Sequence, residues 1–69
     1  MMDYLVVVER TGRNFSAYLP DVPGCVSAGR TQAECLSRIR TALAMHVAGL
    51  KTDGQKPPKP RSVALRVAV

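Results

Sequence analysis

The sequence has few of the residues from which catalytic and metal sites are usually built. Its 69 residues include one histidine, two cysteines, five acidic residues and no tryptophan. His46 has no second histidine at a ligand spacing, and Cys25 and Cys35 form no Cys-x-x-Cys pair, so we expect no bound metal and no cofactor. With no secretory signal after Met1, we expect a cytoplasmic protein whose two small thiols are reduced and buried, in preference to a disulfide.

The five carboxylates are spread along the chain. A two-metal nuclease needs several carboxylates around ions about 3.5–4 Å apart. Asp3 and Glu9 stand at opposite ends of an expected strand, some 20 Å apart at about 3.3 Å per residue. Asp21 and Glu34 are assigned below to a turn and a helix cap, which leaves Asp53 alone. We therefore expect no enzymatic activity.

Long apolar runs and aromatic clusters are also missing. No run of about 18 apolar residues could cross a membrane, and the only aromatic residues are Tyr4, Phe15 and Tyr18. Ten Lys and Arg against five Asp and Glu give a formal net charge of +5, a balance that favours polyanions or acidic partners. The basic residues are scattered, and the densest stretch, 51–61, is predicted to be a solvated proline-rich connector.

The residues that are present predict an antiparallel hairpin followed by a third strand. Residues 4–9 are apolar and β-branched, which is typical of a central strand, and residues 14–19 are its expected partner. A tight turn at Thr11 and Gly12 would place Glu9 opposite Asn14 and Tyr4 opposite Leu19. The core face of this hairpin then consists of Tyr4, Val6, Val8, Phe15, Ala17 and Leu19. Residues 25–28 form the short third strand.

The second half of the chain predicts one helix and one more strand. Residues 32–51 have apolar side chains at intervals of three and four, namely Leu36, Ile39, Leu43, Val47 and Leu50, which predicts a helix with one buried stripe. Residues 62–69 alternate between apolar and small or polar side chains, as a strand does. The expected fold is α+β, a β-β-β-α-β open sheet of order 3-2-1-4 with one helix on one face.

The segment between the second strand and the helix has a dense local signature. Pro20 ends a strand, and Pro23-Gly24 is the central pair of a type II turn. Asp21 is expected to accept hydrogen bonds from the amides just ahead of it. Thr31 is a helix N-cap, and Glu34 completes a capping box. The structural motif as a whole is Pro20, Asp21, Pro23, Gly24, Gly29, Thr31 and Glu34.

This order of features resembles the HicB-like antitoxin family. The family pattern is a strand, then Pro-Asp-x-Pro-Gly-Cys, a short strand, Gly-x-Thr-x-x-Glu and a helix, and this chain has the same order. Residues 1–69 are predicted to be a single domain of this kind. The resemblance implies a partial RNase H-like fold and an antitoxin that binds and neutralises a HicA-type RNA-cleaving toxin. Family members commonly carry a C-terminal DNA-binding module, for which the nine residues after Pro60 are too few. Relatives often have a Glu-rich helix where this chain has Arg38 and Arg40.

A sheet with one helix leaves one face uncovered, and a chain of this length buries little surface. We therefore expect self-association as a dimer or higher oligomer, or a protein partner. The candidate surface for either consists of Leu5, Val7, Tyr18, Met45, Ala64, Arg66 and Ala68. The alternative functions are a small basic oligomeric nucleic-acid-binding protein and an orphan regulatory protein.

Overall fold

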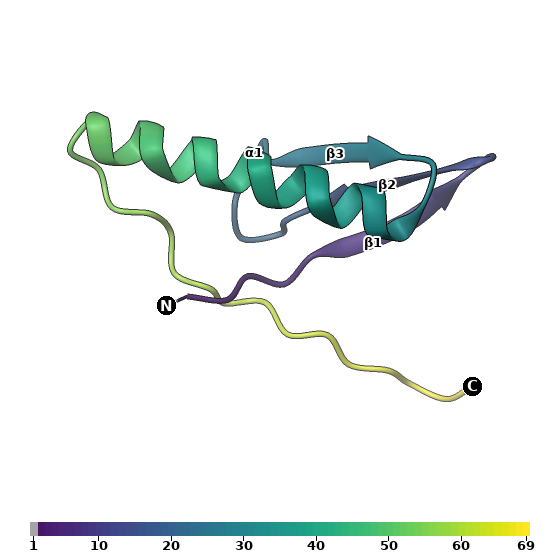
Figure 1. Cartoon of the computed structure of the whole chain (residues 1–69). Helices are drawn as coiled ribbons and strands as arrows, with labels where there is room; N and C mark the ends of the chain where they lie inside the picture. The colour runs from purple at the N-terminus through teal and green to yellow at the C-terminus, as the bar shows by residue number, and fades with distance from the viewer. Residues whose placement is uncertain (1) are drawn as a thin grey trace.

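Three antiparallel strands and one long helix make up the computed structural model, which describes residues 2–69 (Figure 1). The strands are β1 (Val7–Thr11), β2 (Asn14–Tyr18) and β3 (Val26–Gly29), and the helix is α1 (Gln32–Thr52). The sheet order is β1-β2-β3, and α1 packs on one face, chiefly over β3 and β2. The α+β class is as predicted.

The β1–β2 hairpin has a register two residues away from the predicted one. Thr11 pairs with Asn14 and Glu9 pairs with Ser16. The loop is only Gly12-Arg13, and Gly12 has φ 61°, the positive angle that the first central position of a type II′ turn requires. A shift of two residues leaves each side chain on the same face. The predicted core face therefore survives the wrong register.

The corner between β2 and β3 folds as a type II turn. The Cys25 amide donates to the Val22 carbonyl at 3.1 Å across Pro23-Gly24, and Gly24 has φ 84°, as predicted. The Val22 amide donates to the Leu19 carbonyl at 3.1 Å, and the Leu19 amide donates to the Cys25 carbonyl at 3.2 Å. These three bonds hold Val22 in the core, where it is 1% exposed.

The start of α1 is fixed by its cap and by a glycine beneath it. Thr31 Oγ1 accepts from the Glu34 amide at 3.0 Å, so the predicted N-cap is confirmed. The Glu34 carboxylate reaches the Arg30 amide at 3.4 Å, one residue before the amide that a standard capping box uses. A Cβ at Gly29 would lie 3.1 Å from Glu34 Cβ and 3.2 Å from the Cys35 amide. The helix therefore approaches β3 more closely than a larger residue would allow.

Only Ile39 of the predicted apolar stripe of α1 is fully buried, contrary to the prediction. At 1.5 Å per residue, the 21 residues of α1 span about 31 Å, roughly twice the length of a strand of four or five residues. Cys35 and Ile39 lie over the sheet and are buried, whereas Leu36 is 40% exposed. The later stripe residues Leu43, Val47 and Leu50 are only partly buried. The C-terminal half of the helix overhangs the sheet.

The predicted fourth strand is absent from the part of the chain that the structure describes. Residues 62–69 are extended but lie outside the sheet, at the yellow end of the ribbon in Figure 1. The fourth position of the predicted order 3-2-1-4 is therefore wrong for residues 2–69, because alternation gives a segment strand propensity but a strand forms only where an edge pairs with it. The connector is also shorter than predicted, since α1 continues to Thr52.

The positive φ of Gly24 predicts a loss of stability on substitution. Gly24→Val should lower the free energy of unfolding by about 1–2 kcal/mol, because a side chain in the left-handed region is strained, although the space around Gly24 is open. Gly49→Ala is the matched control, since Gly49 lies inside α1 and its Cβ would meet nothing within 4 Å. That change should stabilise by about 0.5–1 kcal/mol. Chemical denaturation measures both, and equal midpoints would contradict the turn assignment.

Candidate protein-interaction site

An apolar row crosses the face of the sheet that α1 does not cover. Val7 pairs with Tyr18, and Tyr18 pairs with Val26, so these side chains lie next to one another on one face. Tyr18 is 42% exposed and Val26 is 63% exposed. The neighbouring positions, Val8, Ala17 and Ser27, are on the opposite face, where Ser27 Oγ donates to the Cys35 carbonyl of α1 at 2.9 Å.

The row lies at one end of the uncovered face, beside the proline corner. The next paired positions on this face, Glu9, Ser16 and Ala28, are polar or small. The row is therefore a compact apolar surface with polar or small residues along one side, an arrangement typical of a protein contact. Val26 was not among the predicted surface residues. Only the β2–β3 register, which the sequence pattern did not provide, places it beside Tyr18.

The structure divides the predicted surface among three places. Val7 and Tyr18 are together in the row, and Leu5 is half-buried just before β1. Met45 is 70% exposed on α1, in the other layer of the fold. The remaining members, Ala64, Arg66 and Ala68, lie in the extended segment outside the sheet.

Asp21 holds the start of that extended segment through hydrogen bonds to residues 61 and 62. Its Oδ2 accepts from the amides of Arg61 and Ser62, both at 2.8 Å, and its Oδ1 accepts from Ser62 Oγ at 2.7 Å. Asp21 makes none of the predicted bonds to the next amides of the corner: the Val22 amide donates to the Leu19 carbonyl, and Pro23 has no N–H to donate. The hydrogen bonds from the Arg61 and Ser62 amides hold the pKa of the Asp21 carboxyl below its ordinary value.

The lowered pKa predicts a pH dependence for this contact. A carboxylate that is stabilised in the folded state loses its contribution as the pH falls through its folded pKa, so the contact should persist at neutral pH and break below about pH 3.9. The Arg61 and Ser62 amide resonances should titrate together in that acid range. Asp21→Ala should give both amides their unbound shifts at every pH, whereas Asp53→Asn, at the end of α1, should change neither. Titration near pH 6 would contradict the assignment.

A second polar contact covers the outer edge of β3. Arg38 Nη1 donates to the Ala28 carbonyl at 2.7 Å, and Arg38 Nη2 pairs with Glu34 Oε1 at 3.0 Å. A charged side chain over an exposed strand edge blocks pairing with another strand. Glu34 and Arg38 therefore protect one edge of the sheet.

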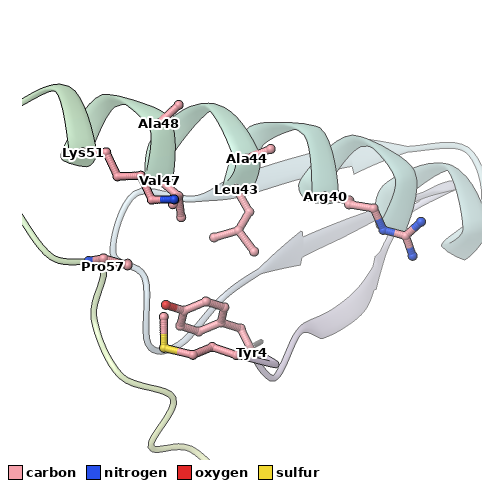
Figure 2. Close-up of a pocket in the computed structure, with 9 residues that line it drawn as sticks. Tyr4, Arg40, Leu43, Ala44, Val47, Ala48, Lys51 and Pro57 are labelled. Carbon is pink, nitrogen blue, oxygen red and sulfur yellow. The ribbon is translucent and has the colours of Figure 1, made fainter.

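A groove runs between the overhanging half of α1 and the N-terminal segment (Figure 2). It has a volume of about 700 Å³. Leu43 and Val47 point into it from α1, and Tyr4 and Pro57 lie across from them. The Tyr4 hydroxyl donates to the Pro58 carbonyl and so holds the connector at the groove. The groove is the consequence of a helix that is longer than its sheet.

The groups that could ligate a metal ion are dispersed within residues 2–69. No three His, Cys, Asp or Glu side chains come together there to hold a metal ion, and no helix in that range is long and apolar enough to cross a membrane. Cys25 and Cys35 are free and buried, and burial raises the pKa of the Cys25 thiol. A buried protonated thiol is a poor nucleophile.

Comparison with known families agrees with the sequence signature. Residues 4–68 match the family described as the HicB-like antitoxin of bacterial toxin-antitoxin systems. The chain belongs to this family. Two relatives extend the comparison. An uncharacterized 14.9 kDa protein from the rep-hol intergenic region of Haemophilus phage HP1 is 34% identical over 58 residues, which are 84% of this chain and 44% of the relative. A UPF0150 protein of Thermoplasma acidophilum is 27% identical over 67 residues, covering 96% of this chain and 97% of the relative.

The HicB-like chain thus spans less than half the length of its phage relative. Among solved structures it is similar to a chain of a HicA3 and HicB3 toxin-antitoxin complex, with a TM-score of 0.69 and 32% sequence identity. That similarity covers 86% of this chain and 70% of the other. The proline corner of the HicB-like signature lies next to the apolar row, because residues Leu19–Cys25 connect Tyr18 to Val26.

Proposed function

We propose that this HicB-like protein is a non-enzymatic antitoxin that binds and neutralises a HicA-type RNA-cleaving toxin. The observation that carries the proposal is the structural similarity to a chain of a toxin-antitoxin complex, at 32% identity over 86% of this chain. Similarity at this level over most of a domain supports a shared mode of use.

The apolar row supports a protein partner. Tyr18 and Val26 are large apolar side chains exposed side by side, and tyrosine is one of the residues that most often dominate binding energy at interfaces. The row has polar neighbours, as the rim of an interface does. A toxin that fits it presents an apolar patch of its own.

The placement of the carboxylates supports binding over catalysis. Asp21 accepts three hydrogen bonds from residues 61 and 62, and Glu34 pairs with Arg38. Carboxylates engaged in this way already have their charge compensated within the protein. The net charge of +5 gives any polyanion a long-range attraction, which the test must separate from specific capture.

The test uses the purified chain and the product of any short reading frame beside its gene. The product of the adjacent reading frame and a duplex of the local promoter are each titrated against the chain, at about 50 and at about 200 mM salt. Toxin capture through apolar contacts should persist at the higher salt, and the complex should suppress RNA cleavage by the toxin. Non-specific binding to the duplex should fall by orders of magnitude over the same range if several phosphates are neutralised.

Three outcomes would contradict the proposal. Failure to capture the adjacent protein, together with sequence-selective duplex binding that survives 200 mM salt, would identify a nucleic-acid-binding regulator. RNA or DNA cleavage by the chain alone, lost on Asp21→Asn, would identify an enzyme. Full growth inhibition by the toxin in cells that also produce this chain would argue against neutralisation.

A further inference from the structure

Residues 63–69 are an extended segment that pairs with no strand in the described part of the chain. Their apolar residues alternate, and Val63, Leu65 and Val67 are 78%, 85% and 88% exposed. Within residues 2–69, no backbone hydrogen bond involves this segment beyond Ser62. An extended backbone with alternating apolar side chains gains both hydrogen bonds and buried surface when it joins a sheet edge.

The two edges of the sheet differ, because the β3 edge is partly covered by a side chain of α1 and the β1 edge is open. At β3, the Arg38 guanidinium covers the Ala28 carbonyl. At β1, no strand of residues 2–69 pairs with the side that faces away from β2. Because α1 packs chiefly over β3 and β2, the helix-facing side chains next to this edge, Val6 and Val8, are also only partly buried.

We propose that residues 63–69 of one copy add to the open edge of β1 in a second copy, so that two chains exchange strands. The chain carries both the free strand and the free edge, and exchange between copies is a common route to a dimer in such a case. This inference goes beyond the proposed function and does not depend on a toxin.

The contacts that anchor residues 58–62 favour pairing with another copy over pairing within the same chain. Asp21 holds Arg61 and Ser62 by three hydrogen bonds, and Tyr4 holds the Pro58 carbonyl. Proline fixes φ at each of its positions, so the connector has little freedom to turn. From this anchor the segment leaves its own sheet, as the yellow trace in Figure 1 shows.

The side-chain pattern determines which face each residue takes in the exchanged strand. Val63, Leu65 and Val67 share one side and would continue the helix-facing layer beside the partner copy's partly buried valines. Arg66 is then on the other face, where β1 carries Glu9. Glu9 is the acidic residue of β1, and Arg66 is the charged residue of residues 63–69. Opposite charges on neighbouring strands favour this arrangement.

Light scattering on the full chain tests the association. We expect a species of twice the 7.5 kDa chain mass at micromolar concentration. Leu65→Asp should shift the dimer dissociation constant at least tenfold upward, because it places a charge in the helix-facing layer. Gln55→Asp is the control: it places the same charge at an exposed position after α1, outside the exchanged strand and β1, and should leave the dimer largely intact. Circular dichroism should show unchanged folding for both.

Isotope-filtered nuclear Overhauser spectra identify the contact directly. A mixture of labelled and unlabelled chains should give intermolecular signals between the methyl groups of Val63 to Val67 and residues of β1. A monomer at all accessible concentrations would overturn the proposal. So would a dimer that shows only intramolecular signals from this segment, or one that Leu65→Asp and Gln55→Asp affect equally.

Discussion

Replacing Ile39 with alanine should lower the free energy of unfolding by about 2–5 kcal/mol. Ile39 is 4% exposed and contacts the core formed by Ala17, Leu19, Val22 and the two cysteines. The loss combines the transfer of the removed methyl groups with the cavity they leave. At roughly 0.05–0.15 kcal/mol per residue, a chain of 69 residues has only about 3–10 kcal/mol of stability. The variant should therefore melt at least about 10 °C lower.

Met45→Ala is the control for Ile39→Ala. It removes a side chain of similar size from the same helix, but Met45 is 70% exposed. Surface substitutions of this kind are usually within about 0.5 kcal/mol of neutral, and alanine favours the helix. Thermal and urea unfolding of the two variants side by side provide the measurement. Similar losses for both would mean that the outer face of α1 is covered in solution.

Local backbone chemistry made the proline corner and the helix start predictable. Gly24 needs a positive φ in a type II turn wherever that turn occurs, and Thr31 caps a helix through a contact three residues away. Such interactions are complete within a few residues. The core face was also predictable, because a register shift of two residues leaves every side chain on the same face of the sheet.

The errors occur in one short turn that the local sequence leaves ambiguous and in two places where distant segments decide the outcome. The hairpin register depended on whether Gly12 is the first or the second central residue of its turn, and composition does not distinguish the two. The partner of Asp21 lies 40 and 41 residues later in the chain, beyond any local pattern. The state of residues 62–69 depends on an available strand edge, which alternation alone cannot provide.

The candidate site was predicted in part for related reasons. Val7 and Tyr18 were expected on the uncovered face because side chains alternate between the two faces along each strand and the hairpin brings these positions onto the same face. Both facts follow from the local sequence. Val26 was missed, since its neighbours depend on how the corner aligns β3 with β2. The sequence predicts Met45 as part of the same surface because a methionine stands in the middle of a polar helix face. The fold places it on α1, in the other layer.

Tyr18→Ala should weaken toxin binding about thirtyfold if the apolar row is the toxin contact. Tyrosines at the centre of an interface often contribute 2 kcal/mol or more, and each 1.4 kcal/mol is a factor of ten in affinity. The fold should be retained, because a cross-strand pair such as Tyr18 with Val7 or Val26 contributes only about 0.2–1 kcal/mol. Calorimetric titration with the toxin, alongside a urea unfolding curve, separates the two effects.

The same titration with Met45→Ala decides between the two layers of the fold. Met45 is more exposed than Tyr18, at 70% against 42%, so exposure alone would favour it as the contact. The row is favoured because Tyr18 has apolar neighbours on both adjacent strands, and hot-spot residues cluster with others of their kind. Unchanged affinity for Tyr18→Ala with a large loss for Met45→Ala would transfer the toxin contact to α1. A loss for Tyr18→Ala alone would place it on the sheet face, opposite the helix.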